Sequence, residues 1–487
     1  MSIIQRESEF YGNFFIFLTM ENLKNSSRVK LFSLVFLIIS SILSIGNWHI
    51  AAQLGIHSIF YLILASLFFM VPVAFISCEL ASTSQTGGGI FGWIKDAFGM
   101  KTALLSTWLM WISNIVWYPT VFTFMAKSLL YYFEPLSSEN PFYVVLLMNL
   151  LFWCGNYANI IGYKFSSNSI SISVILSLVF PAALLIGFAF LSFYHGHDCF
   201  ELVTNDRLID YFPTNKEGFV LLTGLLLGFT GMEMATMHYD HTVEAKKSFP
   251  RAIWLSALLL IIVSILGTLG ISQVIPKQNL NLITDSLDAI FYYLRLFHLD
   301  GWMPLINLLI TIGSWISMSA YLAEPSKAFY QAVKSSQLSR GLAKSNQHAI
   351  PTGIMFLQGI FVTLISIPLA FMKNLTEFYW LLTDIASQLY LLIYIIMFFA
   401  AIKLKVINKT FSVHIIPFKE KGVLFFSSVG LLLSSFSFVF GCLPPKGSEH
   451  SYPIIYSSFV VVFIFLTAFI PLFILKYKRF KKRLVRG

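Results

Sequence analysis

The chain has few charged residues. They make up 11% of its 487 residues, against roughly 25% in an ordinary soluble protein, whereas 57% of the residues are hydrophobic. A water-soluble fold of this size has too little interior to hide that much apolar surface, so part of its solvent must be lipid. The composition excludes a soluble globular protein and predicts an integral membrane protein.

The sequence also lacks the motifs of soluble enzymes and of metal sites. It contains no phosphate-binding loop, no HExxH and no GxSxG. The four cysteines have no metal-ligand spacing, and His195, His197 and Asp198 lack a fourth convergent ligand. We therefore expect no enzyme activity, no metal, no cofactor and no nucleic-acid partner. Cys199 and Cys442 fall on the expected outer side of the membrane, where a disulfide and two free thiols remain alternatives.

Long apolar runs are what the sequence has in abundance. Twelve of them can cross about 30 Å of hydrocarbon at 1.5 Å per residue. The runs cover residues 31–55, 58–82, 102–133, 141–162, 168–194, 218–240, 251–275, 303–333, 351–373, 376–402, 422–443 and 453–476. A glycine-rich joint at 87–99, GGGIFGWIKDAFG, predicts a short interfacial helix. The remaining segments are too short for a soluble domain.

Lysine and arginine are distributed unevenly around these runs. With the N-terminus inside, only six of the 33 lie in the expected outer loops: Arg207, Lys216, Lys277, Arg295, Lys373 and Lys446. Cytoplasmic loops of membrane proteins carry an excess of both residue types. We therefore expect cytoplasmic termini, with residues 1–30 as an N-terminal segment and residues 477–487 as a basic tail.

Two of the predicted spans contain residues that weaken helices. Span 31–55 contains SIGN at 44–47, and span 218–240 contains GFTG at 228–231. Glycine inside a helix costs about 1 kcal/mol relative to alanine, and Ser, Thr and Asn compete for backbone hydrogen bonds. The two spans are five apart, so they cross the membrane in opposite directions. Interruptions at corresponding places in two oppositely oriented halves indicate an inverted-repeat secondary transporter.

The two interruptions also predict a substrate site. Exposed amides at the start of a half-helix attract an anion such as a carboxylate, and freed carbonyls attract a cation such as an ammonium group. A zwitterion fits both. The alternative is that these small residues serve close contact between helices.

Ionisable side chains inside the predicted spans are costly in lipid and few. They are Glu79, Lys127, Glu233, Glu324 and Asp384. Glu233 and Asp384 lie deepest, and Glu233, one turn past Thr230, is placed to sense the site or to brace the opened backbone. The acids at inner ends of spans are expected to reach the surface or to pair locally, as Glu324 can with Lys327. Lys127, at an outer end, is expected to reach the surface.

Several segments resemble the amino acid–polyamine–organocation transporters. ELAST at 79–83 and the following glycine-rich joint are similar to the connection after their second span. GFTGMEMATMH followed by FPRAIW resembles their sixth span and the start of the seventh, and EPSKAFYQAV and HAIPTGIMFLQ resemble the end of span 8 and the start of span 9. VIPKQNLNL at 274–282 and QLYLLIYIIMFF at 388–399 are most similar to the bacterial glutamate/γ-aminobutyrate antiporters.

The resemblance implies an all-α polytopic membrane protein of twelve transmembrane helices in the cell (inner) membrane. Residues 31–194 and 218–402 would form a five-plus-five inverted repeat with discontinuous helices 1 and 6, and residues 422–476 would add two helices. It implies an amino acid exchanger that works by alternating access within the lipid bilayer. Two alternatives stay open. One is a proton-coupled symporter or uniporter for a neutral or cationic amino acid, and the other is a transporter-like amino acid sensor.

The resemblance also assigns residues. It places 45–47 at the substrate carboxylate, 228–230 at the amino group with Phe229 as a gate, and Tyr390 and Tyr394 on one face of span 10. The candidate substrate-binding residues are Ser44, Ile45, Gly46, Asn47, Gly228, Phe229, Thr230, Gly231, Tyr390 and Tyr394. The candidates for coupling or gating are Glu233, Asp384, Trp48 and Trp111.

This sequence departs from the family pattern in three places. Ser171 stands where proton-coupled relatives often carry a lysine, which weakens lysine-mediated proton coupling. Asp384 stands where the antiporters are apolar, so it can bind a cationic group or carry a proton. The chain stops soon after the last span, so an acid-gated C-terminal plug is not expected.

Overall fold

The computed structural model describes residues 30–42, 48–82, 89–133, 135–138, 140–163, 167–196, 216–236, 239, 242–275, 284–336, 341–347, 350–372, 375–407, 415–416, 418–444 and 453–484. All regular secondary structure over these ranges is helical. The predicted all-α class is therefore confirmed for the described part of the chain.

Ten helical segments of the described ranges are long and apolar enough to cross a membrane. They are Gly55–Ala81, Met100–Phe133, Pro141–Ile160, Ser169–Tyr194, Ala245–Val274, Asp300–Ser336, Thr352–Phe371, Glu377–Val406, Lys419–Phe440 and Ile454–Pro471. Each corresponds to one of the twelve predicted spans, so the chain is a multi-pass membrane protein. The two predicted spans without such a segment are 31–55 and 218–240.

In those two spans the described residues form shorter helices. The first contains α2 (Leu31–Ile42) and α3 (Trp48–Ala52), and the sixth contains α12 (Lys216–Leu227) and α13 (Met232–Ala235). Residues 43–47 lie outside the described residues. Residues 228–231 are not helical and separate α12 from α13, so the predicted interruption of the sixth span is present.

The helices around these two spans have the following bounds. In chain order they are α4 (Ser58–Ala65), α5 (Val71–Ala81), α6 (Gly89–Phe98), α7 (Met100–Phe133), α9 (Pro141–Ile160), α11 (Phe180–Tyr194), α14 (Ala245–Val274), α15 (Asp285–Leu296), α16 (Met303–Tyr321), α17 (Ala323–Ser336), α18 (Thr352–Ser366), α19 (Leu375–Ala401), α20 (Lys419–Phe440) and α21 (Pro453–Leu484). Helix α6 confirms that the glycine-rich joint carries a short helix.

A π-helical turn at Ser66–Met70 joins α4 to α5 just before Pro72. Proline has no N–H, and its ring clashes with the carbonyl four residues earlier, so the helix is distorted at this point. The turn carries Phe69, whose ring lies edge-on to that of Tyr394 with 5.5 Å between the ring centres. The distorted segment thus places Phe69 against Tyr394 of α19.

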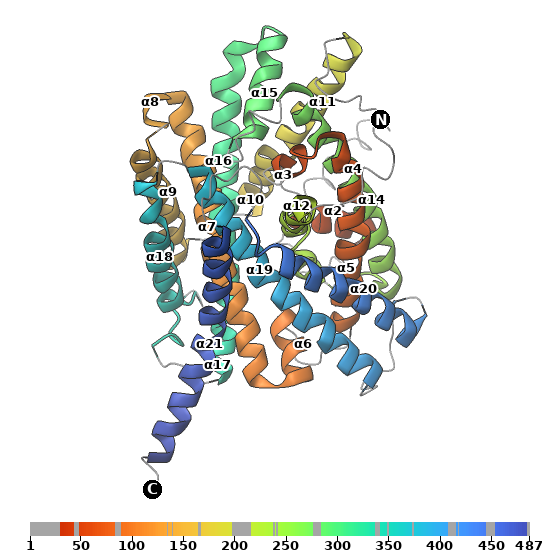
Figure 1. The fold of residues 1–487 in the computed structure, drawn as a ribbon, viewed down its shortest axis with the longest axis vertical. Helices are drawn as coiled ribbons and strands as arrows, with labels where there is room; N and C mark the ends of the chain where they lie inside the picture. The colour runs from red at the N-terminus through yellow and green to blue at the C-terminus, as the bar shows by residue number, and fades with distance from the viewer. Residues whose placement is uncertain are drawn as a thin grey trace, which may run out of the picture.

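Helix α12 lies near the centre of the bundle. Figure 1 looks along its axis, with α7, α16 and α18 on one side and α5 and α14 on the other. α12 contacts α3, α4, α19 and α20, and α13 contacts α2 and α5. Phe229, within the interruption, and Met232, directly after it, are 4% and 2% exposed. The interruption is therefore enclosed by other helices.

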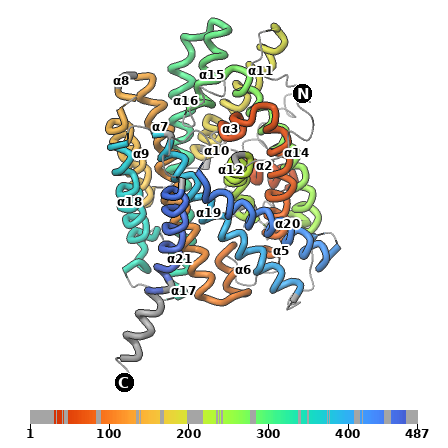
Figure 2. The backbone as a smooth tube through the Cα atoms, in the orientation of Figure 1, coloured from red at the N-terminus to blue at the C-terminus, as the bar shows by residue number. Residues whose placement is uncertain are grey.

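Helix α19 connects the two sides of the bundle. Its most extensive contacts are with α7 and α20, and Figure 2 traces it between them. The Ser113 hydroxyl of α7 donates a 2.8 Å hydrogen bond to the Ala386 carbonyl of α19. α19 turns one set of side chains towards α12 and α13 and another towards α20 and α21. Both sets carry polar groups.

Candidate functional site

The backbone between α12 and α13 leaves the helix through tight turns. The amides of Gly228, Phe229 and Thr230 donate to carbonyls three residues earlier, at 3.0 to 3.1 Å. The Thr230 hydroxyl adds a 2.7 Å hydrogen bond to the carbonyl of Leu227. Gly231 has a φ of +104°, which L side chains rarely adopt. The sequence opens here because a threonine competes for the helix carbonyl and a glycine permits the reversed backbone.

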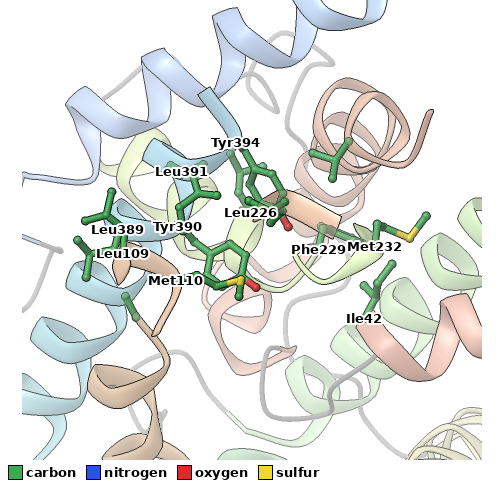
Figure 3. Packing of buried hydrophobic residues seen from close by; sticks show 14 of the residues in the cluster. Ile42, Leu109, Met110, Leu226, Phe229, Met232, Leu389, Tyr390, Leu391 and Tyr394 are labelled. Atoms are coloured by element: carbon green, nitrogen blue, oxygen red, sulfur yellow. The ribbon is translucent and has the colours of Figure 1, made fainter. Parts of the chain in front are cut away.

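The Glu233 carboxylate lies directly after this turn and accepts two tyrosine hydroxyls. Tyr390 donates to Oε1 at 3.1 Å, and Tyr394 donates to Oε2 at 2.7 Å. The amide of Gly231 donates to the same Tyr394 hydroxyl at 3.1 Å. Figure 3 shows both tyrosines projecting from α19 towards the segment with Phe229 and Met232. The structure thus brings together four residues that the sequence named separately.

This arrangement favours one of the two roles left open for Glu233. Through Tyr394, its carboxylate is tied to the backbone of the opened turn, so it braces that turn. The side chain is 3% exposed, and none of the ion pairs among the described residues involves it. The tyrosine hydroxyls and the backbone of Gly231 and Glu233 stabilise this buried carboxylate, and a cationic ligand would supply the positive charge that none of these groups provides.

Two further polar residues beside Glu233 were missed by the sequence analysis. Tyr321 in α16 is close enough to interact electrostatically with the Glu233 carboxylate, and its hydroxyl donates to Asn114 Oδ1 at 3.1 Å. Asn114 in turn donates to the Met110 carbonyl at 2.8 Å. Both lie on spans with many polar and aromatic residues, so no spacing signal singled them out.

The candidates in the first span, Ser44, Ile45, Gly46 and Asn47, lie outside the described residues. The helices that flank these residues are described, and their contacts show how the first span packs against the sixth. α2, before this stretch, contacts α13, and α3, after it, contacts α12. The pieces of the two spans therefore pair in opposite order. Their role in substrate binding stays a prediction.

Trp48 and Trp111 each pack against another helix. Trp48 lies against Gly267 of α14, where a side chain larger than hydrogen would collide with its ring. Trp111 is fully buried, stacks on Phe329 with 4.9 Å between ring centres, and donates to Ser326 Oγ at 3.2 Å. Both tryptophans join helices, and a gating role for either stays a prediction.

Asp384 lies on the other polar face of α19. It is 1% exposed and accepts a hydrogen bond from the Tyr456 hydroxyl of α21. Among the described residues, Asp384 has no hydrogen bond to Glu233, Tyr390, Tyr394 or Gly231. Cys442, near this face, is a free thiol that donates to the Phe438 carbonyl at 3.3 Å, whereas Cys199 lies outside the described residues.

Of the two alternatives for Glu79, reaching the surface is wrong and an ion pair is present, although its partner is not a local one. Its side chain is fully buried, and Oε1 pairs with Lys405 Nζ at 2.9 Å. Its Oε2 accepts the amides of Ile415 and Ile416 at 2.7 and 3.1 Å. The ion pair joins α5 to the π-helical segment Ile402–Ile407 that follows α19.

Two other expectations for charged residues have opposite outcomes. Glu324 pairs with Lys327 at 2.8 Å with both side chains partly exposed, which confirms the predicted local pair. Lys127 is only 9% exposed and lies within electrostatic reach of Asp288, so it does not extend to the surface as expected. The Asp288 carboxylate can therefore stabilise the Lys127 ammonium group in place of water.

Comparisons with known proteins agree with the architecture and the expected resemblance. An uncharacterized transporter of Legionella pneumophila is 29% identical over 451 residues, covering 92% of this chain and 97% of that protein. A glutamate/gamma-aminobutyrate antiporter of Lactococcus lactis is 26% identical over 455 residues, 90% of each chain. A probable agmatine/putrescine antiporter of the same species is 22% identical over 394 residues, 80% of this chain and 82% of that protein. The amino acid permease family matches residues 29–466, nearly the whole chain, and the protein belongs to that family of membrane transporters.

Proposed function

We propose that this protein is a secondary active amino acid transporter that exchanges one amino acid for another by alternating access. The observation that carries the proposal is the opened turn at 228–231, held through Tyr394 to the buried Glu233 carboxylate. An interrupted span beside a buried acid gives a small zwitterion polar partners inside the membrane.

The residues divide between holding the site and meeting the substrate. Tyr390 and Tyr394 orient the Glu233 carboxylate, whose negative charge would attract a substrate ammonium group. Phe229 is buried beside the turn and would have to move for a substrate to pass, as a gate does. In the first span, Ser44 to Asn47 would supply amides to the substrate carboxylate.

The proposal includes a finer description of the fold. The two split spans, added to the ten continuous ones, complete twelve, with 31–194 and 218–402 as inverted repeats and 422–476 as two additional spans. The opposite pairing of α2 with α13 and of α3 with α12 supports a two-fold relation between the halves. The lysine and arginine distribution supports cytoplasmic termini in a cell (inner) membrane.

The substrate class follows less directly. One relative is named for glutamate and γ-aminobutyrate and another for agmatine and putrescine, so the relatives share an amino group more than a net charge. Glu233 fits that shared group. We propose a glutamate/γ-aminobutyrate type of exchange, with a symporter or uniporter for a neutral or cationic amino acid as the second candidate, favoured by the buried Asp384.

Counterflow in proteoliposomes tests the proposal. Liposomes loaded with single unlabelled amino acids are given a trace of the labelled amino acid, at acid and at neutral pH. We expect uptake that requires an amino acid inside, and a loss of about tenfold or more in Glu233→Gln with normal membrane insertion. Glu324→Gln, which removes an acid from an exposed ion pair, is the matched control.

Three outcomes separate the candidates. Uptake that depends on internal amino acid supports exchange, and uptake into empty liposomes supports a symporter or uniporter. Saturable binding to the purified protein without any flux would contradict transport and support a sensor.

A further inference from the structure

A second buried polar cluster lies between α19, α20 and α21, on the face of α19 that carries Asp384. Gln388 follows one turn after Asp384 on this helix and is fully buried. Neither its amide oxygen nor its amide nitrogen has a hydrogen-bond partner. The hydroxyl of Ser437, near the end of α20, is also buried without a partner. Three orphan polar atoms in one region are unusual, because buried polar groups are nearly always satisfied.

These orphan groups come together at the end of α20. A side chain at Gly441 would collide with the amide nitrogen of Gln388 and with Thr223 of α12. The carbonyl of Ser437 accepts both the Gly441 amide, at 2.9 Å, and the Thr223 hydroxyl, at 3.1 Å. The absence of a side chain at Gly441 therefore leaves the Gln388 amide beside the carbonyl end of α20, which carries partial negative charge.

The described groups of this cluster include an acid and no cation. Among the described residues, the titratable groups that face Asp384 are Tyr456 from α21 and Cys442 after α20, and neither is a cation. The ion pairs of the described residues do not include Asp384. A carboxylate and a helix carbonyl end thus share a buried region with an unpaired amide and an unpaired hydroxyl. Such a region is incomplete without a positive charge.

We propose that Asp384, Gln388 and Ser437 form a binding site for a small monovalent cation that prefers oxygen ligands. The carboxylate, the amide oxygen and the hydroxyl are hard oxygen donors of the kind that such cations select. Sodium and the proton are the two sources of this chemistry. Sodium would sit between the three oxygens, and a proton would reside on Asp384 and be donated to the amide oxygen of Gln388.

The position of the cluster gives the cation a role beyond local neutralisation. Thr223 lies one turn before the end of α12, and its hydroxyl ties α12 to Ser437. Cation binding at Ser437 would therefore bias the position of the half-helix that leads into the turn at 228–231. The proposal is that this site couples a cation gradient to transport at the Glu233 site, and in this respect it rests on the proposed function.

A transport experiment tests the coupling. Proteoliposomes receive the amino acid identified by counterflow under an inward sodium gradient at equal pH, an inward proton gradient without sodium, or no gradient. We expect one gradient to raise accumulation several-fold in the wild-type protein. Asp384→Asn and Gln388→Leu should lose this stimulation and keep gradient-free counterflow within about threefold of wild type. Ser427→Ala, which also removes a buried unpartnered hydroxyl but lies about four turns before Gly441, is the control.

The result that would overturn the coupling role is equally definite. Stimulation in the two variants equal to that of the wild type, or no stimulation of the wild type by either gradient, contradicts it. A wild-type protein without any counterflow contradicts the proposed function instead, and the cation site is then judged by a measurement that needs no transport.

Alkylation of Cys442 provides that measurement. Burial and then the negative charge of Asp384 raise the pKa of the Cys442 thiol to about 11, so its reactivity reports the charge on Asp384. N-ethylmaleimide rates are compared in sodium chloride and choline chloride on protein with Cys78, Cys154 and Cys199 changed to serine, with and without Asp384→Asn.

Each outcome of the alkylation experiment has one meaning. A rate that rises about two- to tenfold with sodium in the parent, and not in the Asp384→Asn protein, identifies sodium as the ligand. Equal rates in both proteins without a sodium effect indicate that Asp384 is already neutral and holds a proton. A parent that reacts more slowly than the variant at every sodium concentration carries a charged and empty Asp384, which overturns the proposal.

Discussion

The Tyr394 hydroxyl lies 2.7 Å from Oε2 of Glu233, although 161 residues separate the two in the chain. Since the same hydroxyl accepts the amide of Gly231 at 3.1 Å, one side chain of α19 holds both the opened backbone and the acid. Movement of α19 relative to α12 must therefore disturb the turn and the carboxylate together. We therefore expect substitutions at this contact to change transport through the geometry of the site, and not only through the packing of the helices.

Tyr394→Phe should impair counterflow more than Tyr390→Phe. Each variant keeps the buried ring and loses a hydroxyl, but Tyr394 loses two hydrogen bonds and Tyr390 loses one of 3.1 Å. A hydrogen bond to a charged group contributes about 1.5–3 kcal/mol, so a loss of about tenfold or more in initial rate is expected for Tyr394→Phe. Initial rates of counterflow over a range of substrate concentrations measure it. Equal rates in Tyr394→Phe and the wild type would show that this contact has no role in transport.

Gly231→Ala should reduce transport because the position requires a φ of +104°. An L residue is strained there, so the turn must shift and the hydrogen bond to Tyr394 is lost or lengthened. We expect reduced counterflow and a lower unfolding midpoint in detergent. Gly187→Ala, in α11 with open space around the added carbon, is the control and should leave both unchanged. Full activity of Gly231→Ala would mean that the turn tolerates a different backbone.

The sequence predicted the interruption at 228–231 and the shared face of Tyr390 and Tyr394, because both depend on local residue types and helical spacing. It did not predict that the tyrosines meet Glu233, since hydropathy and spacing carry no information about which helix a face contacts. Glu79 shows the same limit more sharply. Its position near the end of a span favoured a side chain that reaches the surface. Its actual partner, Lys405, is buried and lies far along the chain, so no local sequence pattern predicts it.

Loss of Lys405 should destabilise the protein strongly. Lys405→Met removes the ammonium group that lies 2.9 Å from the buried Glu79 carboxylate, and breaking such a pair costs about 3–5 kcal/mol. Thermal unfolding of the purified protein should show a clearly lower midpoint. Lys327→Met, in the exposed pair with Glu324, should change stability by about 1 kcal/mol or less.

A double variant distinguishes charge from contact. Glu79→Gln combined with Lys405→Met removes both charges, so it should recover part of the stability lost in Lys405→Met alone. A double variant that is less stable than either single one would indicate that the ion pair itself, rather than the unpaired charge, dominates.

Asp288 should make the stability fall as the pH rises. It lies in α15, outside the ten membrane-spanning segments. Burial raises the pKa of its carboxyl above the ordinary value of 3.8, against the opposing effects of the 2.6 Å hydrogen bond from Thr284 and the charges of Lys127 and Arg295. The folded protein then holds this proton more tightly than the unfolded chain. Its contribution is complete below pH 3.8 and is lost as the pH rises through the folded pKa.

Unfolding midpoints measured from pH 3.5 upwards test this sign, and one proton accounts for at most about 1.4 kcal/mol per pH unit. Asp288→Asn should remove that part of the pH dependence, because the amide does not titrate. Asp300→Asn, at a side chain that is 60% exposed, should leave it in place. If the two variants have the same pH profile as the wild type, the buried carboxyl of α15 does not bind its proton more tightly in the folded state.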